Sequence, residues 1–189
     1  MTTISTITSW YKYSQIEYFT PFLKLWLSFN AWYKNSYPNI GPDRNVVDAI
    51  KNDSRIVNKF NELISSSGDE GIDFKKALAR LIEEVRNQKI QDLTGKEVGF
   101  ERTDQEPTFP KLSKKRQNTL INSGNLLHID SNVVINADLN LVYQETIEVI
   151  YLIRCELIHG NLDLDNPRAT RLIKNAYIIL DNIFGPQVR

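Results

Sequence analysis

Residues 151–160 read YLIRCELIHG, an apolar run that carries an arginine and ends on a histidine and a glycine. On a helix that turns about 100° per residue, Arg154 falls within a wide apolar arc, beside Ile150 and Ile158. So wide an arc predicts a central helix, or one that also packs on a second subunit. Because an arginine in apolar surroundings is costly unless it is paired, we expect an anion to meet Arg154.

Apolar residues recur at helical spacing on both sides of this run. The predicted helical segments are residues 18–37, 43–65, 73–93, 138–159 and 167–184. The second segment could break at Asn52-Asp53-Ser54, where Ser54 would cap a new helix, and Ser67-Gly68 with Gly71 indicates a turn before the third. Gly160 follows the fourth segment, where glycine favours a left-handed cap, and Pro167 opens the fifth.

Residues 94–137 differ from these segments because they hold several glycines and prolines and few apolar residues. Phe100, Phe109 and the run Val133-Val134-Ile135 could form short strands, but no clear element emerges. The sequence therefore predicts an all-α fold: one domain, residues 1–189, built as a bundle of five to six helices with an irregular insertion at about 94–137.

Composition limits the function classes. Lys+Arg and Asp+Glu balance at 23 each, so any contact with nucleic acid would need a local basic patch. Cys155 is the single cysteine, which excludes an internal disulfide framework and fits a reducing compartment. The first residues do not resemble a signal peptide, and no run approaches the roughly 18 apolar residues that span a bilayer. We expect a cytoplasmic protein without a membrane partner.

Arg154 and His159 lie about 140° apart around an ideal helix, so they would not face each other within one straight helix. They could meet if the helix ends near His159, or if a second copy of the chain brings its own pair across a two-fold axis. The alternative is structural: Arg154 pairs with a carboxylate from another helix, and His159 is a capping or core residue.

The pattern Arg-x-x-x-x-His, here RCELIH followed by Gly160, resembles the signature of the HEPN superfamily. The opening segment FLKLWLSFNAWY, residues 22–33, resembles the aromatic first helix of several bacterial HEPN families, so the resemblance spans most of the chain outside 94–137. It implies a helical bundle that dimerises so that two Arg/His pairs form one cleft. It also implies a metal-independent endoribonuclease, without a cofactor, of the toxin or antiviral-defence kind, with an antitoxin or defence-system protein as a candidate partner.

The resemblance assigns roles to two residues. RNA carries its own nucleophile, the 2′-OH, so the protein need only move protons and stabilise the phosphorane. His159 would act as general acid/base, because an imidazole can exchange protons near neutral pH. Arg154 would grip the scissile phosphate with its planar fork. Cys155 departs from the Asn, Asp or His that active members often carry after the arginine, and Asn161 stands where some silenced toxins carry a modified tyrosine.

Two further groups are candidates. Asn30, on the aromatic face of the first helix, could orient Arg154 or His159, or bond a helix end. The segment KLSKKR contains Lys114, Lys115 and Arg116, which could guide an RNA backbone or form a solvated loop. No metal site is expected. The competing function is a non-catalytic HEPN module that binds nucleotide, RNA or a protein partner.

Overall fold

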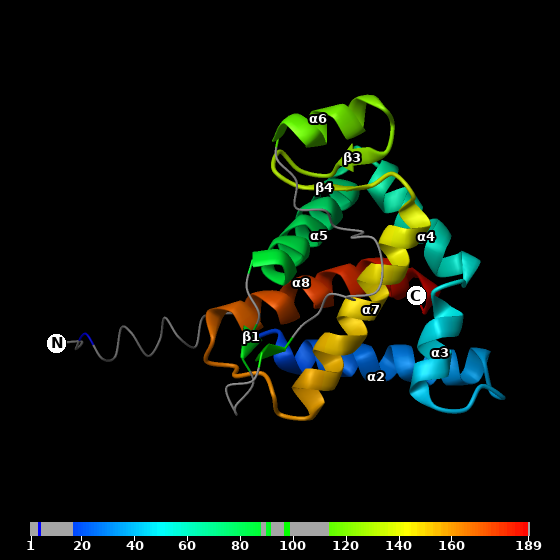
Figure 1. The fold of residues 1–189 in the computed structure, drawn as a ribbon. Coiled ribbons are helices and arrows are strands. Elements are labelled where there is room, and N and C mark those ends of the chain that lie inside the picture. The colour runs from blue at the N-terminus through cyan, green and yellow to red at the C-terminus, as the bar shows by residue number, and fades with distance from the viewer. Residues whose placement is uncertain (1–3, 5–16, 88–89, 92–96, 99–113, 189) are drawn as a thin grey trace.

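A computed structural model describes residues 4, 17–87, 90–91, 97–98 and 114–188 (Figure 1). Seven α-helices, a short 3-10 helix and two pairs of short strands form within these residues. The predicted all-α fold is confirmed. None of the helices in the described residues combines the length and the apolar character needed to cross a membrane.

Helix α8 (Pro167–Phe184) lies at the centre of the bundle. It contacts α5 (Asp69–Asn87), α2 (Phe19–Ser36), α4 (Ser54–Ser65) and α7 (Leu139–Ile158). Figure 1 shows α8 crossing the middle of the molecule, with α5 and α2 on either side of it. Phe29 of α2 anchors this packing, since its ring lies 5.1 Å from that of Phe184 and 5.5 Å from that of Trp26. Such edge-to-face aromatic contacts add to the large apolar area that the rings bury.

The predicted break between two helices is present. Helix α3 (Asp43–Ile50) ends before α4 begins at Ser54. The cap of α4 is Asp53 rather than Ser54, because the Asp53 carboxylate accepts a hydrogen bond from the backbone N–H of Arg55 at 2.9 Å. Asp53 also accepts from the Tyr37 hydroxyl at 2.6 Å, so the residue that follows α2 helps to hold the start of α4 in place.

Helix α5 begins at Asp69, earlier than the sequence predicted. Gly71 lies inside its first turn instead of marking the turn before it. A Cβ on Gly71 would lie 2.6 Å from the Cβ of Ser66 and 2.9 Å from the carbonyl oxygen of Leu63. Glycine is needed here because the end of α4 approaches the start of α5 too closely for any side chain.

Helix α7 closely follows its predicted bounds. Its N-cap is Asp138, whose carboxylate accepts from the backbone N–H of Asn140 at 3.0 Å. Its C-cap is His159, and Gly160 follows with a φ of 71°, the left-handed conformation that was predicted. Helix α8 begins and ends at the predicted residues, Pro167 and Phe184.

The segment predicted as an irregular insertion contains short elements. They are β2 (Glu97–Val98), which pairs with β1 (Ile90–Gln91), then α6 (Lys114–Asn122), β3 (Leu126–His128) and β4 (Val134–Asn136). Strands β3 and β4 are antiparallel, with Leu127 opposite Ile135. The run that suggested a strand is buried, and its residues Val134 and Ile135 lie in β4. Phe100 and Phe109 lie outside the described residues.

Candidate functional site

Arg154 lies where α7, α2 and α3 meet. Its side chain is 19% exposed, and its Nη2 lies 3.5 Å from Oδ2 of Asp43, the first residue of α3. The guanidinium also lies over the indole of Trp26, 5.7 Å from the ring centre, and 3.8 Å separates Nη1 from the Cys155 sulfur. Within one chain, the anion that meets Arg154 is therefore Asp43.

Two side chains of α2 share this carboxylate with Arg154. The side-chain amide of Asn30 lies 3.5 Å from Oδ2 of Asp43, and the ammonium of Lys34 lies 3.5 Å from Oδ1. Asn30 and Lys34 are four residues apart on α2, so they lie on one helix face. The structure thus brings Asn30 and Arg154 together at Asp43. The sequence alone identified neither Asp43 nor Lys34 as part of this site.

These contacts with Asp43 are long. Hydrogen bonds from nitrogen to oxygen usually span about 2.7–3.2 Å, whereas all three donors lie 3.5 Å from the Asp43 carboxylate. By contrast, Arg55 lies 2.6 Å from Asp53 in a nearby ion pair. Asp43 is thus surrounded by donors, but none of them holds it closely.

Several buried donors near Arg154 have spare hydrogen-bonding capacity. In the described part of the chain, Nε of Arg154, Nε1 of Trp26 and the hydroxyl of Tyr33 have no hydrogen-bond partner. Burial raises the pKa of Tyr33, and the negative charge of Asp43 raises it further, which places this hydroxyl within the electrostatic reach of the same carboxylate. Buried polar groups without partners are uncommon, and they often lie at functional sites or where water binds.

His159 ends α7 and is exposed. Among the described residues, no hydrogen bond or ion pair involves its imidazole, so none joins it to Arg154. The helical separation predicted for the two side chains is consistent with this arrangement. One copy of the chain therefore presents a free imidazole and a paired guanidinium at two separate places on the same helix.

The basic cluster lies elsewhere. Lys114, Lys115 and Arg116 form the first turn of α6, and the side chains of Lys115 and Arg116 are exposed. Figure 1 shows α6 at the top of the molecule, whereas the end of α7 that carries His159 lies at the bottom. Within one copy of the chain, the structure does not bring this cluster to Arg154 or His159.

A buried ion-pair cluster connects α3 to α7 and was not predicted. Glu148 of α7 is 5% exposed, and its carboxylate accepts from Arg44 of α3 and from Lys51, the residue that follows α3. Lys51 is 9% exposed and also lies 3.1 Å from Asp48. Burial raises the pKa of Glu148, but the hydrogen bonds and positive charges of Arg44 and Lys51 outweigh it, so the net pKa lies below its usual value. This cluster fastens α3 on α7 and so positions Asp43 beside Arg154.

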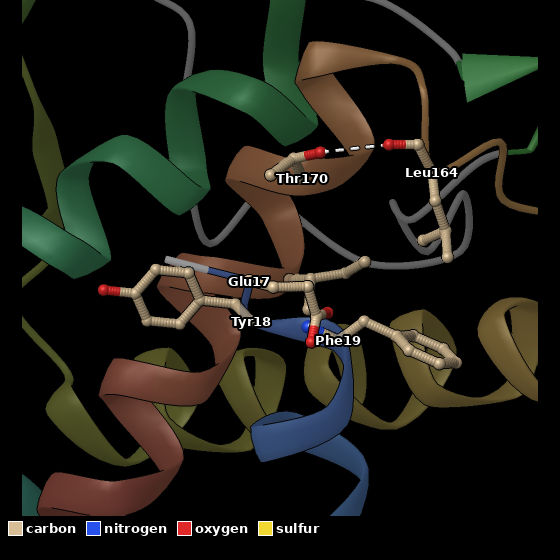
Figure 2. A pocket seen from close by; sticks show the side chains of 6 residues that line it. Glu17, Tyr18, Phe19, Leu164 and Thr170 are labelled. Atoms are coloured by element: carbon tan, nitrogen blue, oxygen red, sulfur yellow. Dashed lines mark hydrogen bonds between the residues drawn. The ribbon is translucent and has the colours of Figure 1, made fainter. Parts of the chain in front are cut away.

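A pocket of about 100 Å³ opens near the start of α2 (Figure 2). Its lining residues are Glu17, Tyr18, Phe19, Leu164, Thr170 and Ile173. Glu17 caps α2 by accepting from the backbone N–H groups of Phe19 and Thr20, and the Thr170 hydroxyl donates to the carbonyl of Leu164 at 3.3 Å. None of the predicted site residues lines this pocket.

No group of His, Cys, Asp or Glu side chains in the described residues is arranged to hold a metal ion. Comparison of the chain with protein-family models, with curated proteins and with solved structures found no match. The case for a function therefore depends on the residues and their geometry.

Proposed function

We propose that this chain is a metal-independent endoribonuclease of the HEPN type, in which Arg154 and His159 act on RNA at a cleft between two copies. One observation carries the proposal: the helix that holds a mostly buried, loosely paired guanidinium ends on an exposed imidazole without a partner. General acid–base catalysis by an imidazole and charge stabilisation by a guanidinium are two contributions that cleavage of RNA by its own 2′-OH can use.

The chemistry divides between the two side chains. His159 would take the proton of the 2′-OH or return one to the leaving 5′-oxygen. Arg154 would stabilise the negative charge that builds on the phosphorane, because its guanidinium stays charged and presents two donors in one plane. Asn30, which shares Asp43 with Arg154, would help to orient the guanidinium.

A homodimer is part of the proposal because Arg154 and His159 do not meet within one chain. Across a two-fold axis, the arginine of one copy can approach the histidine of the other. Ile158, beside His159, is an exposed large apolar residue, which supports an apolar contact near this end of α7. The proposed setting is cytoplasmic, in a toxin or antiviral-defence role, with an antitoxin or defence-system protein as a further partner.

Cleavage of single-stranded RNA in EDTA tests the proposal. The wild-type protein should cleave without metal, and His159→Ala should lower the rate about 10²–10⁴-fold, the range usual for losing a general acid or base. His128→Ala is the matched control, because His128 is the only other histidine of the chain and is exposed on β3. Equal rates for wild type and His159→Ala would refute the proposed role.

A non-catalytic HEPN module is the second candidate, because Arg154 already has a carboxylate partner within the chain. Such a module would bind RNA, nucleotide or a protein partner through the same face and would cleave nothing. The same experiment separates the two candidates: RNA that is bound in EDTA but yields no product at any enzyme concentration favours the binding module.

A further inference from the structure

We infer that Asn30, Lys34 and Arg154 form a binding site for an RNA phosphate, and that the Asp43 carboxylate occupies this site in the free protein. The inference deepens the proposed function and rests on it for the identity of the anion. Its new content is the contribution of Asn30 and Lys34, and the role of Asp43 as a built-in competitor of the substrate.

The geometry supports an exchangeable anion. Three donors from two helices converge on the two carboxylate oxygens of Asp43, each at 3.5 Å. An RNA phosphodiester has two charged non-bridging oxygens, as a carboxylate has, and these can be bound in the forked manner that guanidinium groups favour. Its two ester oxygens add weaker acceptors. Because a phosphate would take the place that the Asp43 carboxylate leaves, the site needs no empty cavity in the free protein.

Charge favours the same exchange. Arg154 and Lys34 contribute two positive charges against the single negative charge of Asp43, so the cluster keeps one positive charge in excess. When Asp43 turns away, both positive charges face the incoming phosphate. Asp43 is 29% exposed, and Lys34 is 60% exposed, so the carboxylate can rotate toward water and the ammonium can follow a ligand.

Buried donors beside the cluster supply a second, independent indication of a ligand. Nε of Arg154, Nε1 of Trp26 and the Tyr33 hydroxyl have no acceptor in the described part of the chain, although each atom is shielded from solvent. Trp26 and Tyr33 are at least nine-tenths buried, and the guanidinium of Arg154 lies over the Trp26 ring. Asp43 leaves these donors unsatisfied, whereas a phosphodiester adds two ester oxygens that can accept from additional donors.

The consequence is a weakened resting affinity for RNA. Every phosphate that binds must first displace Asp43. The apparent affinity therefore equals the affinity of the open site multiplied by the fraction of molecules in which the site is open. Removing the charge of Asp43 should remove this competition and also the repulsion between a carboxylate and a nearby phosphate. Asp43→Asn is therefore expected to bind RNA roughly five- to tenfold more tightly than wild type.

Binding of a short single-stranded RNA with 2′-O-methyl sugars, which has no free 2′-OH nucleophile, tests the inference in EDTA. Asp43→Asn should tighten binding, whereas Lys34→Gln and Asn30→Ala should weaken it about two- to fivefold. Asp48→Asn is the matched control: Asp48 is an exposed carboxylate on the same helix that pairs with Arg44 and Lys51 but not with Arg154. Far-ultraviolet circular dichroism checks that each variant is folded, and Lys34 is exposed enough to change safely.

The inference is overturned if Asp43→Asn binds no more tightly than Asp48→Asn, or if Lys34→Gln binds as well as wild type. Cleavage of unmodified RNA by the same proteins distinguishes this failure from failure of the proposed function. Tighter binding by Asp43→Asn with no cleavage by any protein supports the anion site and refutes the ribonuclease. Cleavage by wild type with unchanged binding by Asp43→Asn supports the ribonuclease and overturns the anion site.

Discussion

Glu148→Gln should destabilise the protein strongly, because it removes the charge that compensates a nearly buried lysine. The Glu148 carboxylate accepts from Lys51 and Arg44, and the side chains of Glu148 and Lys51 are 5% and 9% exposed. In the variant, Lys51 keeps Asp48 at 3.1 Å as its remaining partner, while Arg44 keeps Asp48 at 3.2 Å and stays partly in water. The loss of folding stability therefore comes mainly from the Lys51 charge, which is left with weaker compensation.

Breaking a buried ion pair costs about 3–5 kcal/mol when one charge is left behind. Because Lys51 keeps Asp48, we expect the lower end, about 3 kcal/mol. For a chain of this size, each kcal/mol lowers the melting temperature by about 2–4 °C, so Glu148→Gln should melt about 6–12 °C below wild type. The double variant Lys51→Met with Glu148→Leu should recover most of this loss, since it removes both buried charges together.

Urea unfolding followed by circular dichroism at pH 7 measures the free-energy difference. Glu62→Gln is the control for the same chemical change, because Glu62 pairs with Lys59 at an exposed position and should cost less than about 1 kcal/mol. If Glu148→Gln unfolds within about 1 kcal/mol of wild type, the buried pair does not fasten α3 to α7 as described.

The same pair predicts a pH dependence. The folded-state pKa of Glu148 lies below its usual value of 4.5, so its contribution to stability is fully present above that value. It is lost as the pH falls through the lowered pKa of the folded state. The stability difference between wild type and Glu148→Gln should therefore be constant near neutral pH and shrink below about pH 4.5. A difference that stays constant down to pH 3 would show that the charge of Glu148 is not its source.

Two further pairs of variants test local features. Gly160→Ala should lower the free energy of unfolding by about 1 kcal/mol or more, measured by heat or urea, because φ is 71° at Gly160. Gly41→Ala should lower it far less, since both positions have open space but only Gly160 has a positive φ. Equal losses would contradict a backbone conformation at Gly160 that disfavours a side chain. Tyr33→Phe should leave the unfolding free energy nearly unchanged, because the buried Tyr33 hydroxyl has no partner in the described residues. Tyr143→Phe should instead lower it by about 1–2 kcal/mol, because the Ile50 carbonyl would lose its 2.8 Å hydrogen bond. A larger loss for Tyr33→Phe would indicate that its hydroxyl is bonded in solution.

Helix positions could be predicted well from the sequence where local chemistry decides them. Apolar spacing and the end signals Gly160 and Pro167 placed α7 and α8 almost to the residue. The start of α5 was missed because a close approach of two helices, rather than a turn, requires Gly71. Helix α6 and strand β3 were also missed, and β4 was only suggested by the run Val133-Val134-Ile135, since short strands depend on cross-strand pairing that a single segment does not reveal.

The sequence by itself determined that Arg154 would lie in apolar surroundings near the end of a long helix and that it would need an anion. Only the tertiary structure decided which anion meets it in the free chain: Asp43, which is 111 residues away in sequence. The same holds for Lys51 and Glu148, 97 residues apart. Helical periodicity reports which face of a segment is buried, but the partner across that face depends on how the helices cross, and that is set by the packing of the whole core.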